Sequence, residues 1–296
     1  MRRIQNPTTY RTQLIIAAMV AVLAFAAPLI SRYISPSASS TLSLIRALVP
    51  FSNGTISAAE QQFACRPHAY TTEIVSLDPL LIYIHEFLAP AEIAALLAAG
   101  EPEFAPSEVT KRNRKQHTAD RTSQSAGLPP GDPAVRCVLS RAQQFMGALL
   151  DPARGEIGPP QLVRYTAGQR FNVHHDWYER PQPAKREKMG LGRSWNRVAS
   201  FFAVLQDDCT GGETHFPYVE PVRRDSRTGI GEGGVWFERD AESGGGVAFK
   251  PVKGNALFWV NLHANGTGDE RVMHAGLPLG DGLKTAMNIW PRQYYP

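Results

Sequence analysis

Residues 164–178 read RYTAGQRFNVHHDWY, and around this stretch the chain changes from helix-forming to strand-forming sequence. Bulky and β-branched residues lie on both sides of a turn that contains Gly168. This pattern predicts one strand over 161–165 and another over 170–176. A β-rich fold is therefore expected from this point onward.

Three ionisable residues follow one another in the second of these strands. Because side chains alternate along a strand, His174 and Asp176 share one face while His175 points to the other. One imidazole nitrogen and one carboxylate oxygen are two of the three protein ligands of a non-haem Fe(II) site. A hydrogen-bonded His–Asp pair at the surface has the same local pattern, so a third ligand has to be found elsewhere.

The rest of the chain extends the expected fold. Further strands are predicted at 198–206, 212–216, 247–251, 255–260, 271–275 and 283–290. Upstream, one helix is predicted from Pro90 to Gly100. A second is predicted from Pro133, capped by Asp132, to about Leu150. Two helices followed by eight short strands indicate an α+β, mainly β fold: a sandwich or jelly roll with the N-terminal helices packed on one sheet.

Three long polar segments separate these elements. Residues 107–131 are predicted to form an exposed loop, within which 111–121 could cover a substrate. Residues 180–197 and 219–246 are insertions between strands, and the sequence assigns neither a role.

The N-terminal part differs in composition from the rest. Residues 14–30 form a run of 17 uncharged apolar residues preceded by arginines, which is near the minimum length that spans a bilayer. We expect residues 1–13 to be a cytoplasmic tail, 14–30 a transmembrane signal-anchor and 31–62 a stalk, with 63–296 as a lumenal domain. Cleavage near residues 24–26 stays open and would yield a secreted protein.

The composition also limits which partners the protein could bind and which cellular compartment it could occupy. The net charge of +4 is spread along the chain, unlike the basic patch of a nucleic-acid-binding protein. In an oxidising lumen two of Cys65, Cys137 and Cys209 could pair, and all three pairings stay open. Cys137 lies opposite the apolar stripe of its helix, so we expect a surface thiol or a disulfide there. Sequons at Asn53 and Asn265 are compatible with glycosylation.

A third ligand is available near the C-terminus. His274 lies on a predicted strand that a Gly/Pro turn follows, and Lys284 stands ten residues later on the returning strand. A hairpin of this kind can bring both side chains to one cavity. Three protein ligands would leave positions on iron for 2-oxoglutarate and O2, and a lysine would pair with the distal carboxylate of the cosubstrate. A hydrolytic zinc site is a weaker alternative, because no hydrolase requires this lysine.

These residues belong to longer motifs. The sequence resembles the catalytic domain of the prolyl 4-hydroxylases, 2-oxoglutarate- and Fe(II)-dependent dioxygenases with a double-stranded β-helix fold. The resemblance covers about residues 78–290, is strongest after Gln161, and rests on the stretches YTAGQRFNVHHD, GGETHFP, KPVKGNALFWVNL, GTGDERVMHAGLPLGDGLK and NIW. It places the dioxygenase domain at 63–296 and its iron and cosubstrate core at 161–290.

The resemblance implies a role for each matching residue. His174, Asp176 and His274 would bind iron. Lys284 would bind the distal carboxylate of 2-oxoglutarate, and Tyr165 would hold the cosubstrate through its hydroxyl. L-ascorbate is implied as a further cofactor.

The implied reaction is O2-dependent 4-hydroxylation of prolyl residues in a protein or peptide, with release of succinate and CO2. Together with the N-terminal segment this predicts a single-pass type II glycoprotein of the endoplasmic reticulum membrane. The alternatives are the same chemistry on another peptide side chain or a small molecule, or a non-catalytic module that binds peptide or glycan.

Some residues receive more ordinary expectations. His175 stands where relatives carry an aromatic residue, so we assign it packing or hydrogen bonding. Trp259 and Trp290 are expected to fill the core. The remaining histidines are expected to be surface or core residues: His68, His85, His117, His215 and His263. Nothing in the sequence resembles the separate peptide-binding domain of the animal collagen-modifying enzymes.

Overall fold

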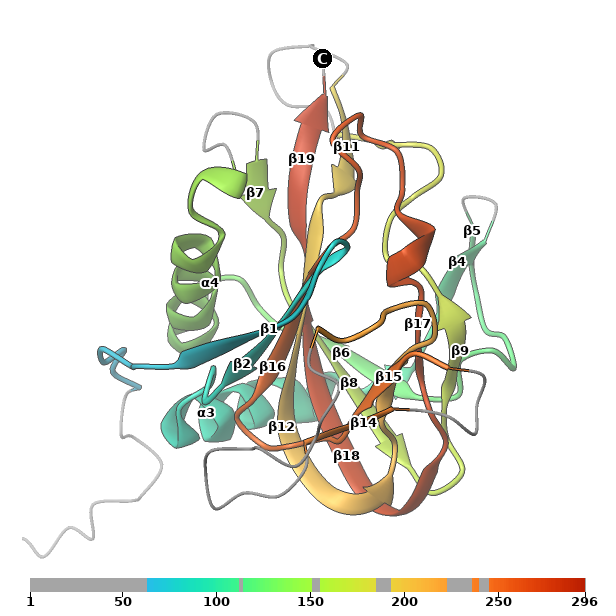
Figure 1. Ribbon diagram of the computed structural model, residues 1–296. Coiled ribbons are helices and arrows are strands. Elements are labelled where there is room, and N and C mark those ends of the chain that lie inside the picture. Colours follow the sequence, from blue (N-terminus) through green and yellow to red (C-terminus); the bar gives the residue numbers. More distant parts are fainter. Residues whose placement is uncertain are drawn as a thin grey trace, which may run out of the picture. The chain divides into compact units, whose positions relative to one another are not determined.

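Strands dominate the computed structural model, and helices cover one side of them (Figure 1). The structure describes residues 63–111, 114–150, 155–184, 193–222, 236–239 and 245–295. The expected tail, anchor and stalk lie outside these residues, as do much of both insertions. From Gln62 onward the chain forms one compact unit.

The described strands form one large sheet and three smaller ones. The large sheet has the order β1 (Thr71–Leu77), β2 (Leu80–His85), β16 (Ala256–Val260), β12 (Ala199–Gly211), β18 (Leu279–Ile289), β8 (Gln161–Thr166), β6 (Gln124–Gly127) and β3 (Ala105–Pro106). The five-stranded sheet has the order β14 (Phe237–Arg239), β15 (Val247–Phe249), β13 (Thr214–Phe216), β17 (His274–Gly276) and β9 (Phe171–His174). The last two sheets are β10 (Gln182–Pro183), β11 (Ser194–Arg197), β19 (Pro291–Tyr295) and β7 (Gly155–Ile157), and the pair β4 (Val109–Lys111) and β5 (Arg114–Gln116).

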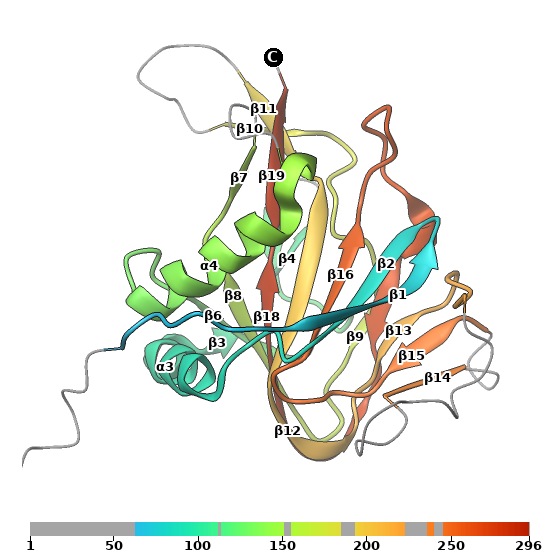
Figure 2. The ribbon, with the colours of Figure 1, turned by 60° about the vertical axis from the view of Figure 1, so that its left-hand side comes forward.

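The helices α3 (Pro90–Gly100) and α4 (Pro133–Met146) pack on one face of the large sheet (Figure 2). Asp132 caps α4 as expected, since its carboxylate accepts from the backbone N–H of Ala134 at 2.8 Å and of Val135 at 3.0 Å. The helix α3 ends at Gly100, as predicted, and a 3₁₀ turn, Glu101–Glu103, follows it. A Cβ at Gly100 would lie 2.4 Å from the side chain of Leu162, so its small size lets α3 approach β8.

The opposite face of the large sheet packs on the five-stranded sheet. Because side chains alternate, Phe258 of β16 joins the helix-side core while Leu257 and Trp259 enter the core between the sheets. Aromatic residues from β13 and β15, Phe216 and Phe249, meet them from the other side. Two antiparallel sheets enclosing a core, with helices outside, make the fold a double-stranded β-helix, as the sequence predicts.

Several boundaries differ from expectation. The predicted strand 271–275 begins with a 3₁₀ turn, Glu270–Val272, and β17 starts only at His274. Likewise β9 ends at His174, so Asp176 lies just beyond the strand. The predicted loop 107–131 contains β4, β5 and β6, which pair with neighbouring strands. The local sequence pattern did not predict these strands because they are only three or four residues long.

The structure pairs Cys65 with Cys137 at a Cα–Cα distance of 5.6 Å, and Cys209 is not disulfide-bonded. Cys137 is buried, so the surface-thiol alternative is wrong. Its helix faces the core with Val138 and Ala142 as well.

None of the helices in the described ranges combines the length and apolar character needed to cross a membrane. Residues 14–30 are not among those described.

Candidate metal centre

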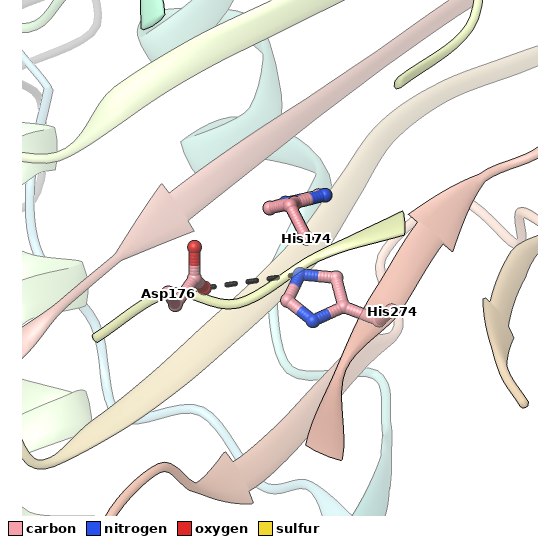
Figure 3. A group of neighbouring side chains, drawn as sticks. All are labelled: His174, Asp176 and His274. Atoms are coloured by element: carbon pink, nitrogen blue, oxygen red, sulfur yellow. Dashed lines mark ion pairs between the residues drawn. The ribbon is translucent and has the colours of Figure 1, made fainter. Parts of the chain in front are cut away.

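Two strands of the five-stranded sheet bring a pair of histidines together. In the antiparallel pairing of β17 with β9, His274 stands directly opposite His174. Asp176 follows two residues after the end of β9, and the three side chains converge (Figure 3). Their potential ligand atoms all lie within 4.8 Å of one another, and Nε2 of His274 is 3.9 Å from Oδ2 of Asp176. The described residues contain no other such group of three or more His, Cys, Asp or Glu side chains.

Backbone carbonyls fix both imidazole rings. Nδ1 of His174 lies 2.8 Å from the carbonyl oxygen of Asn172, and Nδ1 of His274 lies 3.1 Å from that of Val272. A carbonyl oxygen can only accept, so Nδ1 carries the proton and donates in both rings. This leaves the lone pair of each Nε2 available to a metal ion.

Asp176 is held by three neighbours from other elements. Its Oδ2 accepts from the hydroxyl of Ser200 at 2.7 Å and from Nε1 of Trp290 at 3.0 Å. The guanidinium of Arg197 donates to its backbone carbonyl at 3.2 Å. Trp290 was expected in the core, but it lines the cavity and orients this carboxylate. Trp259, in contrast, is buried as expected.

The protonation states suit metal binding. Burial, together with the adjacent His274, lowers the pKa of His174 to about 3 despite the opposing effect of Asp176. Burial also lowers the pKa of His274. For Asp176 burial acts in the opposite direction, but His274, Arg197 and the other neighbours bring its pKa down to about 2. Two neutral imidazoles and one carboxylate are the donor set of the 2-His-1-carboxylate Fe(II) triad, so these residues fit that ion.

A lysine lies deeper in the same cavity. Lys284 on β18 stands opposite Tyr165 on β8, and both are buried. Nζ of Lys284 donates to the carbonyl of Gly212 at 2.6 Å, and no carboxylate in the described ranges forms an ion pair with it. Burial lowers its pKa to about 8, so it is still mainly charged at neutral pH. A buried cation whose hydrogen bond within the described part of the chain goes to a neutral carbonyl fits an incoming carboxylate.

The cavity has a volume of about 2020 Å³ and extends from Lys284 and Tyr165 past the triad. This exceeds the roughly 300–1,000 Å³ of small-molecule pockets, so it can admit a substrate much larger than a dicarboxylic acid. His175 lines it too, but its Nδ1 bonds to the carbonyl of Trp177 at 2.8 Å and its ring stacks on that indole. The expected packing and hydrogen-bonding role of His175 agrees with these contacts.

Sequence reasoning found the triad but missed the residues that surround it. Asp176 is supported by Arg197 of β11, Ser200 of β12 and Trp290 between β18 and β19. Arg121 lines the cavity from the predicted loop. Nothing in the spacing of Ser200 or Arg121 distinguishes them from ordinary polar residues. The stretch NIW did include Trp290, but without showing which way the indole points.

Two facing antiparallel sheets, an imidazole pair with a carboxylate, and a buried lysine in one cavity together define an Fe(II)- and 2-oxoglutarate-dependent oxygenase. A profile described as the 2OG-Fe(II) oxygenase superfamily matches residues 160–292. Over these residues the chain is similar to the prolyl 4-hydroxylase-like enzymes of this superfamily, which are oxidoreductases.

Curated relatives show the same relationship. Prolyl 4-hydroxylase 1 of Arabidopsis thaliana is 29% identical over 230 residues, which are 75% of this chain and 71% of the plant protein. Prolyl 4-hydroxylase subunit alpha-3 of Mus musculus is 30% identical over 224 residues, which are 75% of this chain but only 35% of the mouse subunit. The chain thus spans about a third of the animal subunits that it matches.

Among solved structures, a viral collagen prolyl hydroxylase from Paramecium Bursaria Chlorella virus-1 in complex with 2OG aligns with a TM-score of 0.49 and 20% identity, covering 72% of this chain and 96% of that one.

Proposed function

We propose that the protein hydroxylates prolyl residues of a protein or peptide at the 4-position, using Fe(II), 2-oxoglutarate and O2. The observation that carries this proposal is the group of His174, Asp176 and His274 in one cavity with Lys284. The names of the curated relatives support prolyl residues as the substrate. When bound, iron and cosubstrate would supply oxidation of a C–H bond, with 2-oxoglutarate converted to succinate and CO2.

The protein's own residues bind, orient and exclude water. The triad would hold the metal through two Nε2 atoms and a carboxylate oxygen, since both Nδ1 atoms are already engaged. Lys284 would pair with the distal carboxylate of the cosubstrate, and the hydroxyl of Tyr165 would hydrogen-bond to it. Ser200 and Trp290 would keep the Asp176 carboxylate at a fixed angle. The open, wide end of the cavity would take the peptide.

The test measures succinate. The enzyme is reconstituted anaerobically with Fe(II), given 2-oxoglutarate and a panel of proline-rich peptides, and exposed to O2. We expect O2-dependent succinate together with hydroxyproline in at least one peptide. Succinate no higher than that of the His174→Ala variant would reject enzymatic activity, and succinate without hydroxyproline would transfer the proposal to another peptide side chain or a small molecule.

L-ascorbate is proposed as an auxiliary reductant that restores Fe(II) after turnovers in which no substrate is oxidised. The chemistry of the donor set supports this, because a site open to O2 can lose its ferrous state. Activity over many turnovers should then fall without ascorbate while the first turnover stays unchanged. Equal loss in the first turnover would contradict this role.

The location is also proposed. Residues 14–30 would anchor the protein in the endoplasmic reticulum membrane with the catalytic domain in the lumen, or would be cleaved to release it. The apolar run, the arginines before it and the Cys65–Cys137 disulfide support a secretory route. Asn265 is exposed and available for glycosylation. Digestion of the domain in sealed microsomes by an added protease would reject a lumenal location.

A further inference from the structure

A short backbone segment pairs with β9, the strand that bears His174. Residues 118–122, here called the edge segment, run antiparallel to β9: Asn172 N–H donates to the Asp120 carbonyl at 2.8 Å, and Thr122 N–H donates to the Arg170 carbonyl at 3.1 Å. Between these bonds, Arg121 and Phe171 form an isolated antiparallel bridge. Since β9 is the last strand of its sheet, the edge segment covers a side of β9 that its sheet leaves without a partner strand.

Three side chains form a continuous stack between the edge segment and the metal centre. The guanidinium carbon of Arg121 lies 4.9 Å from the centre of the Phe171 ring. That ring in turn stacks on the His174 imidazole with centroids 3.6 Å apart and planes inclined by 18°. A cation over the face of an aromatic ring is attracted by the ring quadrupole, and more so away from water.

The Arg121 guanidinium is fixed on its other side. Nε donates to the hydroxyl of Ser123 at 3.2 Å, and one terminal nitrogen donates to Ser125 at 3.1 Å and to Gln161 at 3.4 Å. These donors are therefore already committed to neighbours within the protein. This set of bonds suits a group that holds its neighbours in place rather than one that waits for a substrate.

His174 is constrained in two directions. The hydrogen bond from Nδ1 to the Asn172 carbonyl fixes the ring within its own plane. Only a group on its face can stop the ring from tilting, and Phe171 occupies that face. A ligand whose lone pair is misdirected binds metal less well, and outer partners of ligands typically contribute 10–100-fold in metal affinity.

We propose that Arg121 is a positioning residue for the metal centre: it clamps Phe171 against His174 and thereby keeps Nε2 of that imidazole directed at the metal. The inference rests on the proposed metal-binding role of His174. It assigns the task of aligning a ligand to a segment that the sequence predicts as an exposed loop, with a substrate lid as one possibility.

The test uses Co(II) as a spectroscopic probe, in the absence of substrate and turnover. Arg121→Met should weaken Co(II) binding by about tenfold or more and change the d–d absorption of the bound ion. Arg121→Lys, which keeps a cation over the ring, should restore part of both. Arg170→Met is the matched control: it removes an exposed guanidinium from the neighbouring position, and its Co(II) binding should equal that of the wild type.

A double-mutant cycle separates alignment from general weakening of the fold. Phe171→Leu removes the middle of the stack and should reproduce the Co(II) defect. The Arg121→Met/Phe171→Leu double variant should then be no worse than Phe171→Leu alone, because Arg121 acts through that ring. The melting temperature of each variant is measured as well, and it shows whether a loss of Co(II) affinity results from a less stable fold.

Three outcomes would overturn the proposal. They are wild-type Co(II) affinity and spectrum in Arg121→Met, additive effects in the double variant, or a change confined to the peptide KM, which would mark Arg121 as a substrate contact. If Arg121→Met does not fold, Arg121→Lys and Phe171→Leu decide alone. A wild-type protein that does not bind Co(II) would instead reject the metal centre itself, so the two failures are distinguishable.

Discussion

At the scale of single residues, the role proposed for Lys284 predicts that cosubstrate binding can be weakened without weakening metal binding. Lys284→Met would leave the distal carboxylate of 2-oxoglutarate buried without a partner, a loss of about 2–5 kcal/mol. The dissociation constant for 2-oxoglutarate should therefore rise at least about 30-fold, while that for Co(II) should stay close to the wild-type value because Lys284 is not a ligand. Anaerobic calorimetry with each ligand measures both. Equal losses for metal and cosubstrate would contradict the assigned role.

The same residue predicts a pH dependence. Burial lowers the pKa of Lys284 to about 8, and only the protonated form attracts a carboxylate. Affinity for 2-oxoglutarate should be constant below about pH 7.5 and decline towards about tenfold per pH unit well above pH 8, because binding must then take up a proton. Dissociation constants measured across this range test it. Lys284→Arg, which remains charged throughout, should show no such decline.

The convergence of His174, Asp176 and His274 could be predicted from the sequence, because their residue types are specific and their order is informative. His174 and Asp176 are two residues apart, and His274 and Lys284 are ten apart. The supporting residues could not be predicted. Ser200 reaches Asp176 only because the fold brings β12 next to it, and a serine carries no local mark of such a partner.

At the scale of elements, one buried ion pair joins α3 to α4. Arg141 donates to Glu92 at 2.7 Å and to the carbonyl of Phe87 at 2.8 Å. Arg141→Met leaves the Glu92 carboxylate buried without its partner, and we expect a loss of about 3–5 kcal/mol in the free energy of unfolding. Urea denaturation measures this loss.

A double substitution distinguishes the unpaired charge from lost packing. Glu92→Leu combined with Arg141→Met should recover most of the stability, since apolar replacements of a buried pair are often neutral. Glu101→Gln, in the exposed pair with Arg164, should have a much smaller effect. A double variant as unstable as Arg141→Met would show that shape rather than charge determines the loss.

Helices and strands could be predicted where apolar residues recur with a clear period along one face. They could not be predicted where a strand forms only because it pairs with strands distant in the sequence. The capped helix at Pro133 and the strands at 161–165 and 255–260 were predicted nearly to their ends. Strand β19 escaped because Pro291–Tyr295 is rich in polar and aromatic residues, and only its alignment with β11 and β7 makes it a strand. The turn before His274 is likewise set by Asp269, whose carboxylate accepts from the Arg271 N–H.

At the scale of the whole molecule, the disulfide closes a loop between residues 72 positions apart. Closing a loop of this length lowers the entropy of the unfolded chain and stabilises the fold by about 4 kcal/mol. Paired Cys65→Ala and Cys137→Ala substitutions should lower the melting temperature, and a reductant should lower that of the wild type but not that of the variant. Cys209→Ala serves as control. A melting temperature of the wild type that does not respond to the reductant would contradict the pairing.

The same bond also determines how the domain would carry mechanical load. Tension applied to the chain before Cys65 passes through the two sulfur atoms directly into α4 at Cys137. Residues 66–136 lie inside a covalent loop that pulling from that side cannot extend. Strands β1 and β2, helix α3 and the edge segment are therefore outside the path of the force. Arg121 lies inside this loop and is shielded from a pull on the N-terminal side of the domain, whereas Phe171 and His174 follow Cys137 and lie outside the loop.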